Sequence, residues 1–283
     1  MAKSKWARTL VPIGLTFLGM VALISSVAAQ SLPVSVSTAG NTVQATIGTP
    51  GMTLAEVSLV FEDVSGLNVG SIGISAERVD LSDPSLLARL PDAGLLQLSS
   101  ALPLLITIEP PVLGGLSFRG TGRIEVHTHA LAYTVGSSLR LVKAPLDGAF
   151  RDITDEVAQG SVRARGTYGG FSQFLIVTDL RPSGAVVDTK IDWLRGRIAA
   201  LPEPERAGFA ALLDEAQAGV ADADYAAALV AIDALRARAE SRGGQQLANE
   251  WRATRNAENQ AGELAAGAAT LRFSVAYLRD FGQ

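Results

Sequence analysis

The stretch RIEVHTHAL, residues 123–131, alternates charged or polar side chains with aliphatic or small ones, and this period of two decides the fold class of the N-terminal half. Successive side chains of a β-strand point to opposite faces. Arg123, Glu125, His127 and His129 therefore share one face of a predicted strand, and the intervening side chains share the other. One polar and one apolar face are typical of an antiparallel sheet that covers a core on one side.

The same texture extends over residues 30–182, where short runs rich in Val, Ile, Thr and Phe are separated by Gly, Pro, Asn and Asp. Such spacing is typical of a sandwich or barrel. The segment SDPSLLARL is predicted to be helical, with Ser82 or Asp83 as its cap and Pro84 in its first turn. We therefore expect an antiparallel β-sandwich domain over residues 30–182. Its nine candidate strands are LPVSVST, NTVQATIG, TLAEVSLVF, GSIGISAERV, PLLITIEP, GRIEVHTHAL, SLRLVKAP, GSVRARGTY and FSQFLIVTDL.

From residue 183 to residue 283 the chain becomes rich in alanine, and apolar side chains recur with the helical period of about 3.6 residues. Four helices are predicted, and the last runs from Gln246 to Arg279 with Trp251 on its inner side. Residues 270–278 also alternate as a strand would, so a strand that returns to the sandwich is the alternative there. The fold class predicted is α+β and multidomain: an N-terminal antiparallel β-sandwich followed by a C-terminal antiparallel helical bundle.

Residues 1–29 have the pattern of a signal peptide. Three basic residues precede an apolar run from Leu10 to Val27, and small residues at Val27 and Ala29 predict cleavage before Gln30. The alternative is an uncleaved segment, because the run approaches the roughly 20 residues that span a bilayer. The chain has no cysteine, so neither disulfides nor a cysteine-linked lipid anchor are expected. The predicted location is exported, either periplasmic or extracellular.

The charge balance is acidic. Residues 1–29 hold three of the 24 basic groups and none of the 28 acidic groups, which leaves 21 against 28, a net charge of −7, after their removal. A nucleic-acid-binding protein normally shows a basic surface, so nucleic acid is not expected as a partner. Beyond Arg8 the only lysines are Lys143 and Lys190. A membrane is expected as a partner only through the N-terminal segment if it is uncleaved.

The only histidines, His127 and His129, are the candidate metal ligands. Two steps along a strand place them about 6.6 Å apart, close enough to share one ion. A stable zinc site needs four ligands, or three and a water, so a carboxylate from a neighbouring strand would have to contribute. The alternative is a solvated polar face. The sequence shows no G-x-S-x-G, H-E-x-x-H, S-x-x-K or Walker lysine motif, so no catalytic residue and no cofactor are assigned.

One long stretch carries a resemblance. The segment LRLVKAPLDGAFRDITDEVAQGSVRARGTYGGFSQFLIV, residues 139–177, resembles the closing strands of β-sandwich modules in bacterial exported proteins, with their F-x-D-I-T edge and G-G-F-S-x-F turn. Together with TIEPP at residues 107–111 and the HTH strand, the chain is similar to uncharacterised exported bacterial proteins that pair such a module with an alanine-rich C-terminal helical region. The resemblance implies the architecture and assigns no catalytic residue.

The function expected is that of an exported, non-enzymatic binding or structural protein. Its expected partner is an envelope or extracellular protein or a glycan, recognised by surface complementarity. The alternative is a metal-binding protein or a metal-dependent enzyme that uses the face with His127 and His129.

Overall fold

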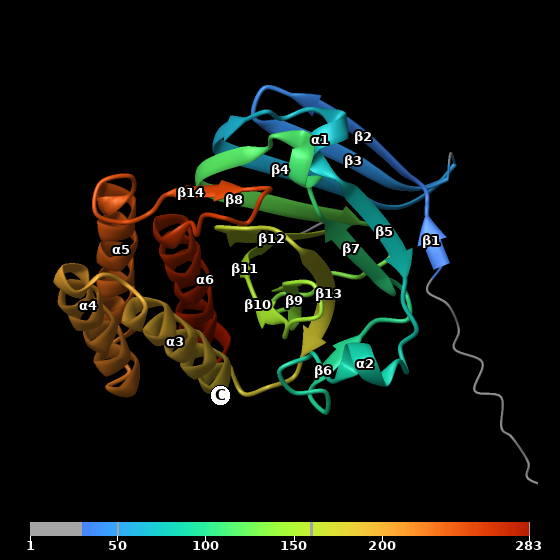
Figure 1. Ribbon diagram of the computed structural model, residues 1–283. Helices are drawn as coiled ribbons and strands as arrows, with labels where there is room; N and C mark the ends of the chain where they lie inside the picture. Colours follow the sequence, from blue (N-terminus) through green and yellow to red (C-terminus); the bar gives the residue numbers. More distant parts are fainter. Residues whose placement is uncertain (1–29, 50, 159–160, 283) are drawn as a thin grey trace, which may run out of the picture.

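The computed structural model describes residues 30–49, 51–158 and 161–282, and the predicted leader at residues 1–29 lies outside them. Two antiparallel sheets face each other, and the longer helices lie together beside them (Figure 1). The α+β fold class is therefore confirmed. Side chains of both sheets form one apolar cluster, including Leu59 and Ile124 from one sheet and Leu141 and Phe174 from the other.

The first sheet, here sheet I, has the order β1-β5-β7-β13-β9-β10, and β6 pairs with β13. Its outer face is covered by a smaller apolar cluster that includes the helix α2. Asp83 caps α2 and Pro84 is its first residue, as predicted. The strands of sheet I are β1 (Gln30–Leu32), β5 (Ile74–Arg78), β6 (Leu96–Leu98), β7 (Leu104–Ile108), β9 (Leu139–Ala144), β10 (Arg151–Asp152) and β13 (Gln173–Asp179).

The second sheet, sheet II, has the order β11-β12-β8-β4-β3-β2, and β14 pairs with β8. On β8, Ile124 and Val126 are buried and Arg123 is exposed, so the predicted alternation is confirmed. The strand ends at Thr128. The hydroxyl of Thr128 accepts a bond from the backbone N–H of Ala130, a local turn that competes with the ladder. The strands of sheet II are β2 (Val34–Ala39), β3 (Thr42–Thr49), β4 (Met52–Ser65), β8 (Ser117–Thr128), β11 (Thr154–Ala158), β12 (Val162–Tyr168) and β14 (Glu250–Arg252).

The C-terminal helices share a second apolar core built from the predicted stripes, with Ile191, Phe209, Ile232 and Leu264 among its buried members. None of the helices in the described part of the chain is long and apolar enough to cross a membrane. The helices are α1 (Val69–Ile72), α2 (Pro84–Leu87), α3 (Ser183–Ala199), α4 (Glu203–Ala221), α5 (Tyr225–Arg242) and α6 (Gln260–Phe281), with a short 3₁₀ turn, η1 (Val112–Gly114).

The predicted last helix is wrong in its first half. Helix α6 begins at Gln260 rather than at Gln246, because the side chain of Asn259 caps it by accepting a bond from the N–H of Gly262. The preceding segment returns to sheet II, where β14 places Trp251 opposite Phe118 with their rings stacked at 5.5 Å. Residues 270–278 are helical, which confirms the predicted helix there over the alternative strand.

Helix α6 joins the two halves of the molecule. It contacts α3 and α5 on one side and β8, β11 and β12 on the other (Figure 1). The amide of Asn259 donates to the carbonyls of Gly120 and Gly169, which ties the start of α6 to the ends of two strands. A division into two domains after residue 182 stays a prediction. The contacts of α6 and β14 show that the halves share a continuous interface.

Candidate functional site

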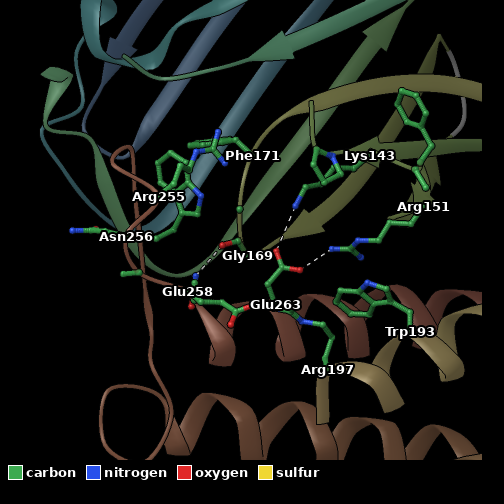
Figure 2. A pocket seen from close by; sticks show the side chains of 17 residues that line it. Lys143, Arg151, Gly169, Phe171, Trp193, Arg197, Arg255, Asn256, Glu258 and Glu263 are labelled. Atoms are coloured by element: carbon green, nitrogen blue, oxygen red, sulfur yellow. Dashed lines mark hydrogen bonds and ion pairs between the residues drawn. The ribbon is translucent and has the colours of Figure 1, made fainter. Parts of the chain in front are cut away.

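A cleft of about 800 Å³ opens where the end of the sandwich meets α3 and the start of α6 (Figure 2). Strands β9 and β10, the turn at Gly169 and Gly170, the loop before α6 and the two helices contribute to it. Its charged lining residues are Lys143, Arg151, Arg197, Arg255, Glu258 and Glu263.

Glu263 lies at the centre of these charges, and Figure 2 shows it pointing from α6 toward the strands. One of its oxygens, Oε1, is 3.4 Å from Nζ of Lys143, and the other, Oε2, is 2.9 Å from a terminal nitrogen of Arg151. The three side chains are 15%, 8% and 21% exposed, respectively. Two nearly buried cations therefore share one carboxylate.

The local sequence explains how these groups meet. Lys143 and Arg151 are directly opposite each other in the β9–β10 ladder, so their side chains leave the same face of sheet I. Glu263 lies in the first turn of α6, where the helix dipole favours a negative charge. A Cβ atom on Gly169 would collide with the backbone nitrogen of Glu263. The glycine pair, predicted as a turn, thus permits the close approach of α6.

Burial and the neighbouring charges shift both pKa values. Burial lowers the pKa of Lys143 to about 8, although the charge of Glu263 opposes the shift. Burial alone would raise the pKa of Glu263, but Lys143, Arg151 and Arg197 outweigh it and hold that pKa at about 2. At neutral pH the carboxylate of Glu263 is therefore ionised. The ammonium group of Lys143 is charged, but neutral pH lies only slightly below its pKa.

Two of the cleft arginines lie against aromatic rings. The guanidinium carbon of Arg151 is 3.9 Å from the ring centre of Trp193, a cation–π contact visible in Figure 2. That of Arg255 is 4.9 Å from the ring centre of Trp251. Arg197 forms an ion pair with Glu258. Four cationic and two acidic side chains line the cleft, an excess of two positive charges in a chain of net charge −4.

The predicted metal ligands lie elsewhere, on sheet II. Nδ1 of His127 is 3.0 Å from Oε2 of Glu56 on β4, and Nε2 contacts the hydroxyl of Ser161. The ring centres of His127 and His129 are 4.9 Å apart, so the two side chains do lie side by side. The side chain of His127 is 15% exposed, whereas His129 is exposed. Within residues 30–282, apart from the gaps named above, no three His, Cys, Asp or Glu side chains are arranged to hold a metal ion.

Glu125, on the same face, is held by two arginines instead. Its carboxylate is 3.5 Å from Arg163 and 2.5 Å from Arg165. The chain of contacts from Ser161 through His127 to Glu56 has the connectivity of a nucleophile, a base and an acid. These three residues do not line the cleft. We therefore place the candidate site at the cleft and keep metal binding by His127 and His129 as a prediction.

One family model matches residues 17–279, and its description is "Family of unknown function (DUF6689)". The chain belongs to this family. No curated protein and no solved structure matches the chain. The match spans both the sandwich and the helices, so both sides of the cleft fall within the DUF6689 region. The predicted resemblance to uncharacterised proteins agrees with this family, while the bacterial origin and export of the chain stay predictions.

Sequence reasoning missed the charged residues of this DUF6689 cleft, although one signal was present. The chain has only two lysines after Arg8, and both are buried beside a carboxylate where the sandwich meets the helices. Lys190 on α3 is 2.8 Å from Asp152 on β10 and donates to the carbonyl of Thr270 on α6. The rarity of lysine in this chain is thus the sequence signal that marks Lys143 and Lys190 as buried partners of acids.

Proposed function

We propose that this chain is an exported, non-enzymatic binding protein whose cleft takes up a small ligand with an anionic oxygen group, a carboxylate or a phosphate. The observation that carries the proposal is the excess of cationic side chains in a cleft of about 800 Å³. That volume is typical of small-molecule sites, which measure about 300–1,000 Å³. The overall charge of the chain is negative, so the charge of the cleft lining differs in sign from that of the chain as a whole.

The geometry of the central group supports recognition of an oxyanion. Arg151 and Lys143 share a single acidic partner, Glu263. A second carboxylate or a phosphate would therefore add charge-assisted hydrogen bonds to cations that are already desolvated. Guanidinium groups match carboxylate and phosphate geometry in a bidentate manner. Arg197, in contact with the exposed Glu258, provides a further donor at the rim.

Binding fits the arrangement better than catalysis. Each cation of the cleft contacts an acid: Lys143 and Arg151 contact Glu263, Arg197 contacts Glu258, and Arg255 is 2.6 Å from Glu109. Ion pairs of this kind fix the positions of the cationic groups. Nucleophilic catalysis requires instead a base that is free to accept the proton of the nucleophile. The leader pattern of residues 1–29 supports export.

The experiment is calorimetric titration of the purified chain with acetate and with inorganic phosphate at low ionic strength, where charge attraction is least screened. We expect saturable binding of at least one anion, weakened at least fivefold in R197M. The matched control is R195M, because Arg195 lies on the same helix, contacts Asp214 and does not line the cleft. No binding of either anion, or equal losses in R195M and R197M, would contradict the proposal.

One observation favours the alternative function, metal binding. Glu56 on the neighbouring strand β4 places a carboxylate oxygen 3.0 Å from Nδ1 of His127, although in the described residues no three such side chains are arranged to hold a metal ion. Elemental analysis of untagged protein decides this candidate. A molar equivalent of zinc, copper or nickel that disappears when both histidines are replaced by alanine would establish it, and the absence of such metal would remove it.

A further inference from the structure

A second cavity of about 180 Å³ lies directly behind the cleft. Ala149, Phe150, Arg151 and Trp193 line both spaces and form the wall between them. The far side of the cavity is made by residues of α3 and α6, among them Val186. The ligand-binding space therefore has two neighbouring compartments.

The second cavity suits an apolar group. Phe150, Val186 and Trp193 are among the residues that line it, and Phe150 and Val186 are buried. Four charged residues also line the cavity, and each has a partner of opposite charge: Lys190 is 2.8 Å from Asp152, Arg181 is 2.7 Å from Asp179, and Arg151 is 2.9 Å from Glu263. A cavity of about 150 Å³ lined by apolar side chains binds benzene, so this volume accommodates one compact ring.

The wall between the compartments contains both an arginine of the cleft and a small, exposed residue. Arg151 is stacked on Trp193, and its guanidinium reaches Glu263 in the cleft. Ala149 is the smallest of the four shared residues, and it is exposed in the loop between β9 and β10. A ligand bound to Arg151 through its anionic group would thus have an apolar space within reach across Ala149.

Resting on the anion-binding function proposed above, we infer that the ligand is a compact apolar ring that carries an oxyanion. The oxyanion stays in the cleft beside Arg151 and Arg197. The ring enters the second cavity past Ala149 and contacts Val186 and Trp193. Burial of the ring supplies affinity and selects against ring-free anions, because apolar area removed from water is stabilising.

The test compares pairs of anions that differ by a ring: phenylacetate against acetate, and phenyl phosphate against inorganic phosphate. Calorimetry on the purified chain should show at least about tenfold tighter binding of the ring-bearing member of the preferred pair, as expected when a phenyl group is buried. A149W should abolish that gain by closing the passage, and V186F should do so by filling the cavity. V186F should keep the affinity for the ring-free anion within about twofold of the wild type, because Val186 lines the second cavity and not the cleft. For A149W the readout is the affinity ratio within each pair of anions, because Ala149 lines the cleft as well.

The matched control is L146W, the same bulky side chain at another exposed position of this loop that lines neither compartment. It should retain the full gain. Equal affinity with and without the ring would overturn the inference and leave the anion site standing, as would a gain that persists in both A149W and V186F. If neither acetate nor phosphate nor their ring-bearing partners bind, the proposed function itself fails. Because Ala149 is in an exposed loop, A149W keeps the test valid if V186F does not fold, which circular dichroism will show.

Discussion

Replacing Glu263 by glutamine removes the carboxylate that Lys143 and Arg151 share while keeping the size of the side chain. We expect this variant to be the most destabilising conservative change in the cleft. Two cations that are 8% and 21% exposed would be left without their acidic partner. Removal of one partner of a buried ion pair leaves an uncompensated charge and costs about 3–5 kcal/mol.

The pKa of Glu263 gives a separate measure of the same loss. Its fall from 4.5 to about 2 corresponds to about 3 kcal/mol of stabilisation of the charged form, at 1.36 kcal/mol for each pKa unit. The pKa of Lys143 is already near 8, and it falls further in E263Q because the charge that raises it is gone. Release of that proton relieves part of the cost. We therefore expect a loss of about 3 kcal/mol in the free energy of unfolding at pH 7, toward the lower end of the range.

The assay is urea unfolding followed by tryptophan fluorescence, with E258Q as the matched control. Glu258 also contacts an arginine of the cleft, but its side chain is 56% exposed, so E258Q should lose less than about 1 kcal/mol. The double variant K143M/E263Q should be more stable than E263Q, because the uncompensated amine is gone. A loss below about 1 kcal/mol in E263Q, or no recovery in the double variant, would refute the electrostatic account of the cleft.

The remaining predictions concern pH, backbone contact and processing. The stabilising contribution of Glu263 is complete above its unfolded pKa of 4.5 and should be lost as pH falls toward about 2; urea unfolding of the wild type and E263Q should therefore converge in acid. Affinity for acetate should fall as pH rises through about 8, where Lys143 loses its charge; a flat titration series from pH 7 to 9.5 would contradict this role of the amine. G169A should lower stability by about 1–3 kcal/mol because the added methyl group collides with α6, whereas G184A, with no atom within 4 Å of its Cβ, should be neutral or slightly stabilising; thermal melting measures both. Amino-terminal sequencing of the native product should begin at Gln30, and an intact Met1 would reject cleavage of the leader.

The regular elements were the predictable part of this fold. Alternation in β8 and the apolar stripes of α3, α4 and α5 depend only on the period of the side chains along one element, which the sequence displays directly. The prediction of the last helix was wrong in its first half because Leu247 and Trp251 continue the helical period by coincidence. The true start of α6 is encoded by Asn259, a good N-cap residue, but the return of β14 to sheet II depends on a match with Phe118 far away in the chain.

The charged residues of the cleft could not be predicted from local sequence patterns. Lys143 lies in β9, a strand with every residue buried, so a charged side chain does not mark an exposed face there. Glu263 is 120 residues from Lys143 and 112 from Arg151, so nothing in the local pattern links them. The pairing follows from the close contact at Gly169, which is a property of two surfaces rather than of one segment.

The return of β14 to sheet II has a consequence for the order of events during synthesis. Strand β8 is complete at Thr128, yet Trp251, which stacks on Phe118 of that strand, emerges more than a hundred residues later. The aromatic surface of Phe118 and Phe171 that Trp251 contacts is therefore synthesised before the side chain that covers it. A chain truncated after residue 182 would leave this aromatic surface without the indole ring that covers it.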